Sequence, residues 1–252
     1  MQNIVENECV VSGRNAVREL LRSGRDIDKI YVQRGEREGS VKVLVAKAAE
    51  RKIPVIESDR QKLDSVSGGT CHQGIVAIAA EQNYSTVDEI IAYAAERGEE
   101  PFIVIADGIE DPHNLGAIIR SGDASGVHGV IIPKRRSVGL TPVVSKASAG
   151  ALMHMRVAKV TNLASTIDEL KERGFWIYAA DMGGTDYSKT DFSGRIAVVL
   201  GSEGFGISRL VKEKCDFTVS IPLYGNVNSM NVSCAAAVIL TEAARQRHLK
   251  EG

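Results

Sequence analysis

The chain has 252 residues, 44% of them hydrophobic and 25% charged, and its 31 basic and 32 acidic side chains give a formal net charge of −1. This length accommodates one large domain or two smaller ones, and the balanced charge is unlike that of many general nucleic-acid binders, although it leaves room for a local basic face. The sequence contains no run of about 18 apolar residues and no basic N-terminal stretch followed by an apolar core, so we expect no membrane span, no secretory signal and a cytoplasmic location.

Helix and strand patterns alternate through the first part of the chain. The first helix is predicted within residues 10–21, with Ser12 or Asn15 as its cap. Its apolar face would consist of Ala16, Val17, Leu20 and Leu21. We then predict a strand at 27–32, a helix at 41–51, a strand at 53–56, a helical turn at 62–66 and a strand at 74–79. This alternation is typical of a small α/β domain, which we place at residues 1–80.

Basic side chains gather on the first predicted helix and just after it: Arg14, Arg18, Arg22 and Arg25. They would suit RNA phosphates, but a solvated helix face explains them equally well. His72 and Gln73 precede the last strand of this domain, where a role in the turn weighs at least as much as a contact to RNA.

The composition changes at residues 81–100, which are acidic and contain a single amphipathic helix. Ser85 or Thr86 is the expected cap of this helix, and Gly98 follows its end. We therefore predict a linker that docks one helix, followed by a second domain at 101–252.

The second domain begins with a continuous apolar strand at 102–106, of the kind found in parallel sheets. A loop is expected at 107–116. The elements predicted after it are a helix at 117–124, a strand at 129–132, a basic loop at 133–136, a helix at 142–151, a strand at 155–160, a helix at 165–173 and a strand at 175–179. This repeated alternation indicates an α/β domain with a parallel sheet.

The last stretch, 196–245, carries the strongest pattern. A predicted strand at 198–200 ends at the loop GSEGFG, a second strand at 218–222 is followed by a flexible polar loop, and 232–244 has helical spacing. Two strand ends would therefore present glycine, asparagine and serine side by side, where open α/β sheets bind ligands. The loop spells GxxGxG rather than GxGxxG, which disfavours a nucleotide-binding dehydrogenase. Two ordinary βα turns are the simpler alternative.

Three segments resemble the motifs of one family. DPHNLGAIIRSGDASGV, VVLGSEGFGIS and IPLYGNVNSMNVSCAAAVIL resemble the three motifs of the SpoU (TrmH-like) RNA 2′-O-ribose methyltransferases, in the family's order. SGRNAVRELL and CHQGIVA are similar, more weakly, to the L30e-like domain that binds substrate in many members. The resemblance implies an α/β protein whose C-terminal parallel-sheet domain forms a deep trefoil knot, preceded by a small L30e-like α/β domain. Knots are so rare that periodicity alone would not predict one.

The resemblance also implies S-adenosylmethionine as the cofactor. Seven residues match positions that bind it in the family: Leu200, Gly201, Gly204, Ile221, Leu223, Ser229 and Met230. Gly201 would let the chain approach the cofactor closely, and the chain around Ile221, Leu223 and Met230 would enclose the adenine. Met230 replaces a commoner leucine of similar volume.

The catalytic residues implied by the resemblance are Arg120, Asn114, Glu203, Ser229 and Asn231. The first motif assigns Arg120 to the ribose hydroxyl and Asn114 to a supporting contact, and we expect Glu203 to organise the site. Because the pKa of arginine lies above about 12, we favour Arg120 as a cation that stabilises developing alkoxide, with Arg120 as general base as the alternative. A salt bridge from Arg120 to Asp123 or Glu203 is the purely structural alternative.

The closest fit within the family is a methyltransferase acting on a guanosine ribose of 23S rRNA. A tRNA ribose 2′-O-methyltransferase and a catalytically silent RNA-binding relative are the alternatives. The residues expected to contact RNA are Arg14, Arg18 and Arg120. Relatives pair through the knotted domain, so we expect a homodimer, which the small-residue run at 234–237 would permit by close packing.

We expect no metal site. Glu110, Asp111 and His113 are close together in sequence, but Pro112 makes a turn the better interpretation, and methyl transfer from a sulfonium needs no metal. The four cysteines are scattered without a CxxC pair, which predicts reduced thiols in a reducing compartment. Cys234, in an apolar helical run, is expected to be buried.

Overall fold

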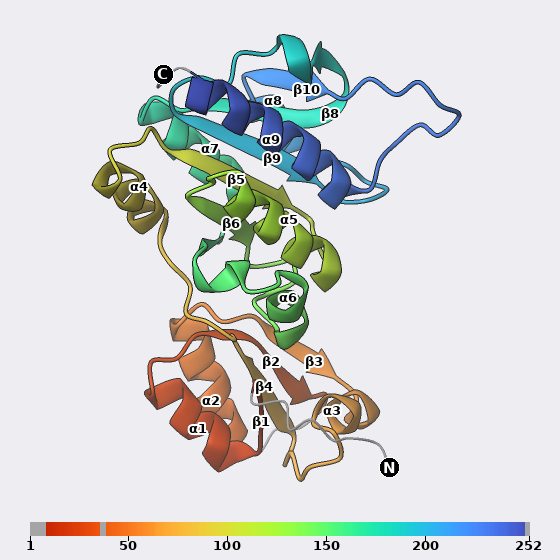
Figure 1. Ribbon diagram of the computed structural model, residues 1–252. Helices are drawn as coiled ribbons and strands as arrows, with labels where there is room; N and C mark the ends of the chain where they lie inside the picture. The colour runs from red at the N-terminus through yellow and green to blue at the C-terminus, as the bar shows by residue number, and fades with distance from the viewer. Residues whose placement is uncertain (1–8, 36–38, 250–252) are drawn as a thin grey trace. The chain divides into compact units, whose positions relative to one another are not determined.

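The computed structural model describes residues 9–35 and 39–249 and divides into two compact units (Figure 1). The first unit contains the chain up to Asn83 together with Gly139–Pro142, and the second contains Tyr84–Val138 and the chain from Val143 on. Within the described ranges, no helix has both the length and the apolar character that crossing a membrane requires.

The first unit is a four-stranded sheet with helices packed on it. Its elements are β1 (Val10–Ser12), α1 (Arg14–Arg22), β2 (Ile27–Gln33), α2 (Gly39–Glu50), β3 (Val55–Ser58), α3 (Arg60–Val66) and β4 (Ile75–Ala79). The strand order is β1-β4-β2-β3, in which β3 is parallel to β2 while β4 is antiparallel to β1 and β2. Val17, Ile30 and Leu44 belong to one buried cluster, so α1, β2 and α2 share a core.

The start of this unit differs from the prediction. Residues 10–12 form β1 and pair with β4 rather than opening the helix. The backbone N–H of Arg14, at the start of α1, donates to the side-chain oxygen of Gln73 at 3.1 Å. The cap of α1 therefore comes from a residue far along the chain, which helical periodicity cannot reveal. Three predictions were wrong here: Ser12 and Asn15 as caps, and Ala16 as a buried residue.

The second unit is built on a six-stranded sheet. Its elements are α4 (Val87–Glu96), β5 (Phe102–Asp107), α5 (Pro112–Ala124), β6 (Gly129–Pro133), α6 (Pro142–Ala147), β7 (Arg156–Val160), α7 (Leu163–Glu172), β8 (Trp176–Asp186), β9 (Ile196–Gly201), α8 (Arg209–Lys214), β10 (Phe217–Ser220) and α9 (Val232–Leu249), with short 3₁₀ turns at Ala151–Met153 and Tyr187–Lys189. The strand order is β10-β8-β9-β5-β6-β7, and every neighbouring pair is parallel. This confirms the predicted α/β fold with a parallel sheet.

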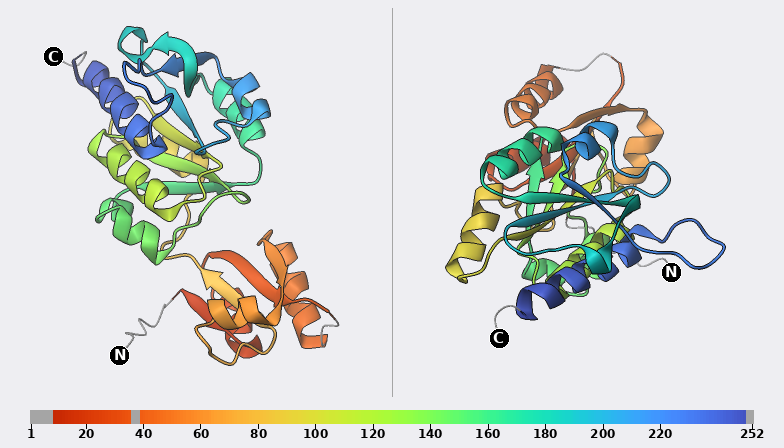
Figure 2. Two further views of the ribbon diagram at one scale, coloured as in Figure 1. Left: turned by 90° about the vertical axis from the view of Figure 1, so that its right-hand side faces the viewer. Right: turned by 90° about the horizontal axis from the view of Figure 1, so that it is seen from above.

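Helices cover both faces of this sheet. In Figures 1 and 2, α5 and α9 run side by side across one face, whereas α7 and α8 lie on the other. Ile90 of α4, Ile167 of α7 and Val211 of α8 form one buried cluster with the strand residues of that second face. Because parallel strands buried on both faces leave only their ends open to ligands, the functional site is expected where the strands end.

Several boundaries in this unit differ from the prediction. Helix α5 begins at Pro112 rather than at 117, because Asp111 caps it by accepting the N–H of His113 at 2.7 Å. The predicted loop at 107–116 is therefore shorter, and Asn114 lies on the helix. The helix expected at 142–151 ends at Ala147, β8 runs on to Asp186, and α8 was not predicted at all.

The acidic segment at 81–100 contains α4. Thr86 and Glu89 form a capping box at the start of this helix, and Ile90 is fully buried against the second unit's core. The deep knot and the L30e-like character of the first unit stay predictions.

A glycine in α5 brings two helices close together. A Cβ at Gly116 would lie 2.5 Å from the Cβ of Ala147 and 2.8 Å from the carbonyl oxygen of Val144, both in α6. Any side chain here would overpack the contact, so this position in α5 accepts only glycine without movement of α6.

We expect Gly116→Ala to lower the free energy of unfolding by about 1–3 kcal/mol, because the added methyl group must displace α6. Gly122→Ala is the matched control on the same helix, since its Cβ would meet neighbours only at 3.4 Å or more and alanine has the higher helix propensity. Urea denaturation of both variants tests this, and equal stability of the two would contradict it.

Candidate active site

The polar residues of the three motifs meet at the edge where the strands of the second unit end. Asn114 lies on α5, Glu203 in the loop after β9, and Asn231 immediately before α9. The Nδ2 of Asn114 donates to Oε1 of Glu203 at 3.2 Å, and the Nδ2 of Asn231 donates to Oδ1 of Asn114 at 3.1 Å. Asn231 also donates to Glu203. We call these three residues the amide–carboxylate set.

Asn231 has a second structural role. Its Oδ1 accepts the backbone N–H of Ser233 at 2.9 Å and the hydroxyl of Ser233 at 2.6 Å, which caps the start of α9. One asparagine thus fixes both the helix start and the orientation of the neighbouring amide and carboxylate. The sequence did not predict these contacts of Asn231, although the polar pair of the third motif had already identified Asn231 as a candidate site residue.

A cavity of about 740 Å³ opens at the ends of β9 and β10 and beside the middle of β8, and we call it the β8–β9 cavity. All seven residues predicted to bind the cofactor line it, together with Glu203 and Asn231. Other lining residues escaped the sequence reasoning, among them Asp181, Met182 and Ile239. Asp181 and Met182 lie in β8, which was predicted to end at residue 179. A longer predicted strand would have included both.

Glycine is required at Gly201 for a reason that the sequence did not reveal. A Cβ there would lie 2.2 Å from the carbonyl carbon of Gly206 and 2.3 Å from the nitrogen of Ile207. The loop folds back on itself, since Ser202 and Gly206 exchange backbone hydrogen bonds of 3.0 and 2.9 Å. The sequence predicted that Gly201 lets the chain approach the cofactor closely. In this structure the close neighbour of Gly201 is the backbone of its own loop, at Gly206 and Ile207.

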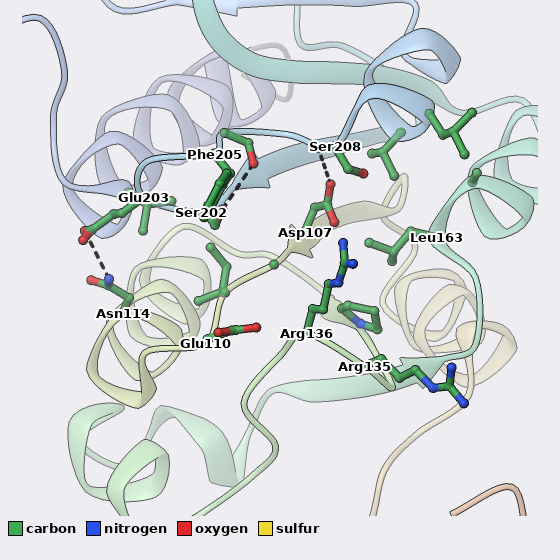
Figure 3. Close-up of a pocket in the computed structure, with 18 of the residues that line it drawn as sticks. Asp107, Glu110, Asn114, Arg135, Arg136, Leu163, Ser202, Glu203, Phe205 and Ser208 are labelled. Atoms are coloured by element: carbon green, nitrogen blue, oxygen red, sulfur yellow. Dashed lines mark hydrogen bonds between the residues drawn. The ribbon is translucent and has the colours of Figure 1, made fainter. Parts of the chain in front are cut away.

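A second cavity, of about 810 Å³, lies at the ends of β5 and β6, and we call it the β5–β6 cavity (Figure 3). Among its lining residues are Asp107 from β5, Arg136 after β6 and Phe205 at the tip of the loop. Ser202, Glu203, Gly206 and Val232 line both cavities. The loop after β9 therefore forms a wall between them.

Arg120 lies apart from the other predicted catalytic residues. It is exposed on α5 and lines neither cavity. In the part of the chain that the structure describes, it forms no ion pair, so the salt bridges to Asp123 or Glu203 considered as alternatives are absent. The third motif's Ser229, by contrast, lines the β8–β9 cavity.

The arginines predicted to contact RNA in the first unit have local partners. Arg14 Nε donates to the carbonyl oxygen of Gln73 at 3.2 Å, and Arg18 donates to the side chain of Asn15 at 3.0 Å. His72 accepts the N–H of Gly74 through Nδ1 at 3.0 Å. His72 and Gln73 thus have the turn and capping contacts that were one of their two interpretations.

Residues 101–241 match the family described as "SpoU rRNA Methylase family". The chain belongs to the SpoU rRNA methylase family. Residues 10–85 match a second family, described as "RNA 2'-O ribose methyltransferase substrate binding". These matches confirm the family resemblance on which the three motifs were interpreted, and they make the chain an RNA methyltransferase of this family.

Relatives and solved structures agree with this assignment. The chain is 48% identical over 242 residues to a Staphylococcus haemolyticus protein assigned to the TrmH family of tRNA/rRNA methyltransferases, covering 96% of this chain and 97% of the relative. Its structure is similar to that of the SpoU methyltransferase AviRb from Streptomyces viridochromogenes in complex with AdoMet, with a TM-score of 0.60, 25% identity and coverage of 95% and 90% of the two chains. A TrmH/SpoU tRNA modifying enzyme of A. aeolicus is 31% identical with a TM-score of 0.55, over 61% of this chain and 78% of that one.

The remaining sequence predictions for this SpoU family member concern cysteines and metals. Cys234 is exposed, so its predicted burial was wrong. It lies midway between the buried Val232 and Ala236, which places it on the opposite face of α9. Asp111 is a helix cap, and within residues 9–35 and 39–249 no three His, Cys, Asp or Glu side chains are grouped to hold a metal ion.

We expect Asn231→Asp to destabilise this SpoU protein at neutral pH. The new carboxylate keeps the helix cap but loses the donors to Asn114 and Glu203 and places a like charge beside Glu203. Asn162→Asp is the matched control, because Asn162 caps α7 by accepting N–H groups at 2.9 and 3.3 Å, and no hydrogen bond donated by its side chain occurs in the described part of the chain. Thermal unfolding should show a loss for Asn231→Asp alone, and equal melting temperatures of the two variants would count against the amide–carboxylate set.

Proposed function

We propose that this protein transfers a methyl group from S-adenosylmethionine to the 2′-hydroxyl of an RNA ribose, and that the nucleotide is a guanosine of 23S rRNA. The supporting observation is that residues from all three motifs converge on one strand edge: Glu203 and Asn231 line the β8–β9 cavity, and Asn114, bonded to both, lines the neighbouring β5–β6 cavity. The family match and the substrate-binding match support RNA as the substrate.

The β8–β9 cavity fits the proposed cofactor. Its volume of about 740 Å³ lies within the range of about 300–1,000 Å³ common for small-molecule sites. Leu200, Ile221 and Met230 would hold the purine through apolar contacts, while Asn228 and Ser229 would offer polar groups to the ribose and amino-acid portions. The AdoMet-bound structures of AviRb and of an rRNA methyltransferase from Sinorhizobium meliloti are similar in fold.

The proposed mechanism assigns separate tasks to the chain's own residues. S-adenosylmethionine, when bound, supplies a methyl group that is already electrophilic. The protein must therefore align the ribose hydroxyl and stabilise the negative charge that develops as its proton leaves. Arg120 would stabilise that negative charge as a permanent cation, and Asn114, held by Glu203 and Asn231, would orient the ribose.

We further propose a homodimer that brings Arg120 to the partner's cavity. Arg120 lines neither cavity of its own subunit, which supports this arrangement. The loop between β10 and α9 carries Tyr224 and Val227, which are 96% and 70% exposed, while other residues of the same loop line the β8–β9 cavity. Two large apolar side chains so exposed beside a ligand cavity suit an interface with a second copy.

The relatives favour no single RNA, because their names include both tRNA and rRNA. Ribose methylation of tRNA is therefore the second candidate. Mapping 2′-O-methyl groups on rRNA and tRNA from a deletion strain separates the two. Loss of one methyl group from 23S rRNA is the expected result, and loss from tRNA alone would refute the rRNA assignment. We also propose that Arg14 and Arg18 contact RNA phosphates and that the protein acts in the cytoplasm.

We expect Arg120→Ala to reduce single-turnover methyl transfer at saturating RNA by about a hundredfold or more, because removing one positioned electrostatic contact costs about 3 kcal/mol in the transition state. Affinity for S-adenosylmethionine should stay near that of the wild type. Arg120→Lys keeps the charge but not the planar fork, so it should recover only part of the rate. Near-normal turnover of Arg120→Ala would make Arg120 a docking or structural residue.

We expect the purified protein to be dimeric by light scattering at micromolar concentration, and Val227→Asp to shift it toward the monomer by placing a charge in the interface. Val43→Asp is the matched control, because Val43 is 56% exposed on α2 of the first unit. A monomeric wild-type protein would refute the dimer, and an unchanged Val227→Asp dimer would exclude the loop from the interface.

A further inference from the structure

The β5–β6 cavity shares one wall with the proposed cofactor cavity, and its most distinctive residue is Arg136. The backbone of Arg136 has φ 54°, in the left-handed region that residues with a side chain avoid at a cost of about 1–2 kcal/mol. In Figure 3 its side chain extends toward the middle of the cavity, whereas that of Arg135 turns outward. The structure thus keeps a strained backbone at the residue whose guanidinium enters the cavity.

The charge of Arg136 is not used within the subunit. Arg135 and Arg136 are both exposed, and neither forms an ion pair or hydrogen bond in the part of the chain that the structure describes. An arginine that neither pairs nor packs gains no stability in return for its strained backbone. An anionic ligand bound to Arg136 would offset the cost of this strained backbone.

Most carboxylates around the cavity already have donors. Asp107 accepts the N–H of Ser208 at 2.7 Å, Asp111 caps α5, and Glu203 accepts two amides. Glu110 is exposed and has no such bond among the described residues. These donors are neutral, so the four carboxylates keep their charge and outnumber the two arginines. Arg135 and Arg136 are the basic side chains among the described lining residues, so a phosphate could be held only on their side of the cavity.

Phe205 provides a different kind of contact at the opposite wall. It is 95% exposed at the tip of the loop that separates the two cavities, and it lines only the β5–β6 cavity. An aromatic ring held so far out of the core has no packing role, but its face is open for stacking. An exposed ring facing an unpaired arginine across a cavity is the combination that single-stranded RNA uses, with its base on the ring and its phosphate on the cation.

We propose that the β5–β6 cavity binds the nucleotide next to the methylated one, with its phosphate on Arg136 and its base stacked on Phe205. This inference rests on the proposed RNA 2′-O-methylation. Asn114, which would orient the reacting ribose, also lines this cavity, so the reacting nucleotide would stand at its edge beside Asn114. The flanking nucleotide would lie between Arg136 and Phe205, which the paired backbone of Ser202 and Gly206 separates from the cofactor cavity. Glu203, shared by both cavities, would link the flanking nucleotide to the amide–carboxylate set.

The test uses the full-length protein and poly(U), a single-stranded RNA, in fluorescence anisotropy titrations at several KCl concentrations. Arg136→Gly should weaken binding about tenfold and lower the slope of log affinity against log salt by about 0.7, the value for one phosphate contact on a single strand. Phe205→Ala should weaken binding about tenfold without changing that slope, and Phe205→Trp should restore it, because stacking needs only an aromatic face. Arg195→Ala is the control, since Arg195 is paired with Glu100 before the start of β9, at the far end of that strand.

Two further measurements make the result decisive. Arg136→Gly should unfold at or above the wild-type temperature, because glycine accepts the left-handed backbone, so weaker binding cannot be ascribed to misfolding. Calorimetry with S-adenosylmethionine should give wild-type affinity for Arg136→Gly and Phe205→Ala. A wild-type protein that fails to bind S-adenosylmethionine refutes the proposed function. Absence of poly(U) binding by the wild type, or binding by both variants within twofold of it, overturns the flanking-nucleotide site.

Discussion

The hydrogen bonds among Asn114, Glu203 and Asn231 are the constraint on which the active site depends. They connect α5, the loop after β9 and the start of α9, which lie as much as 117 residues apart in the chain. Each side-chain amide has one donor group and one acceptor oxygen, and here the oxygen and nitrogen of Asn231 are both used. The oxygen and nitrogen of Asn231 therefore cannot be exchanged without loss of a hydrogen bond. The same side chain thus determines both the position of α9 and the geometry of the site.

The parallel sheet explains why two cavities stand side by side. All six strands end at one edge, and the loop after β9, the third strand from the β10 side, separates ligand space over β8 and β10 from ligand space over β5 and β6. Gly201 makes this wall thin, since the backbone of Gly206 lies where its Cβ would be. A thin wall carrying Glu203 would allow residues on its two sides to act on one RNA strand, as we propose.

The errors in the sequence interpretation have local and non-local causes. The start of α5 could have been found, because an aspartate followed by proline is a strong signal for a helix start. The cap of α1 could not, because it comes from Gln73, whose φ of 49° and position depend on the fold of the first unit. Cys234 was misplaced because a run of small residues has no apolar face that periodicity can recognise.

The sequence by itself determined the alternation of strands and helices, the parallel sheet and, through three motifs, the family and the candidate residues of the site. Only the tertiary structure decided which of those residues share a cavity: the seven predicted cofactor residues do, whereas Arg120 stands apart on α5. It also brought Arg136, from the predicted basic loop, and Phe205, from the second motif, to the walls of one cavity, although neither had been assigned a role from the sequence. The physical reason is that local patterns report the periodicity and turn chemistry of nearby residues, while a cavity is formed by loops that only the packing of the sheet brings together.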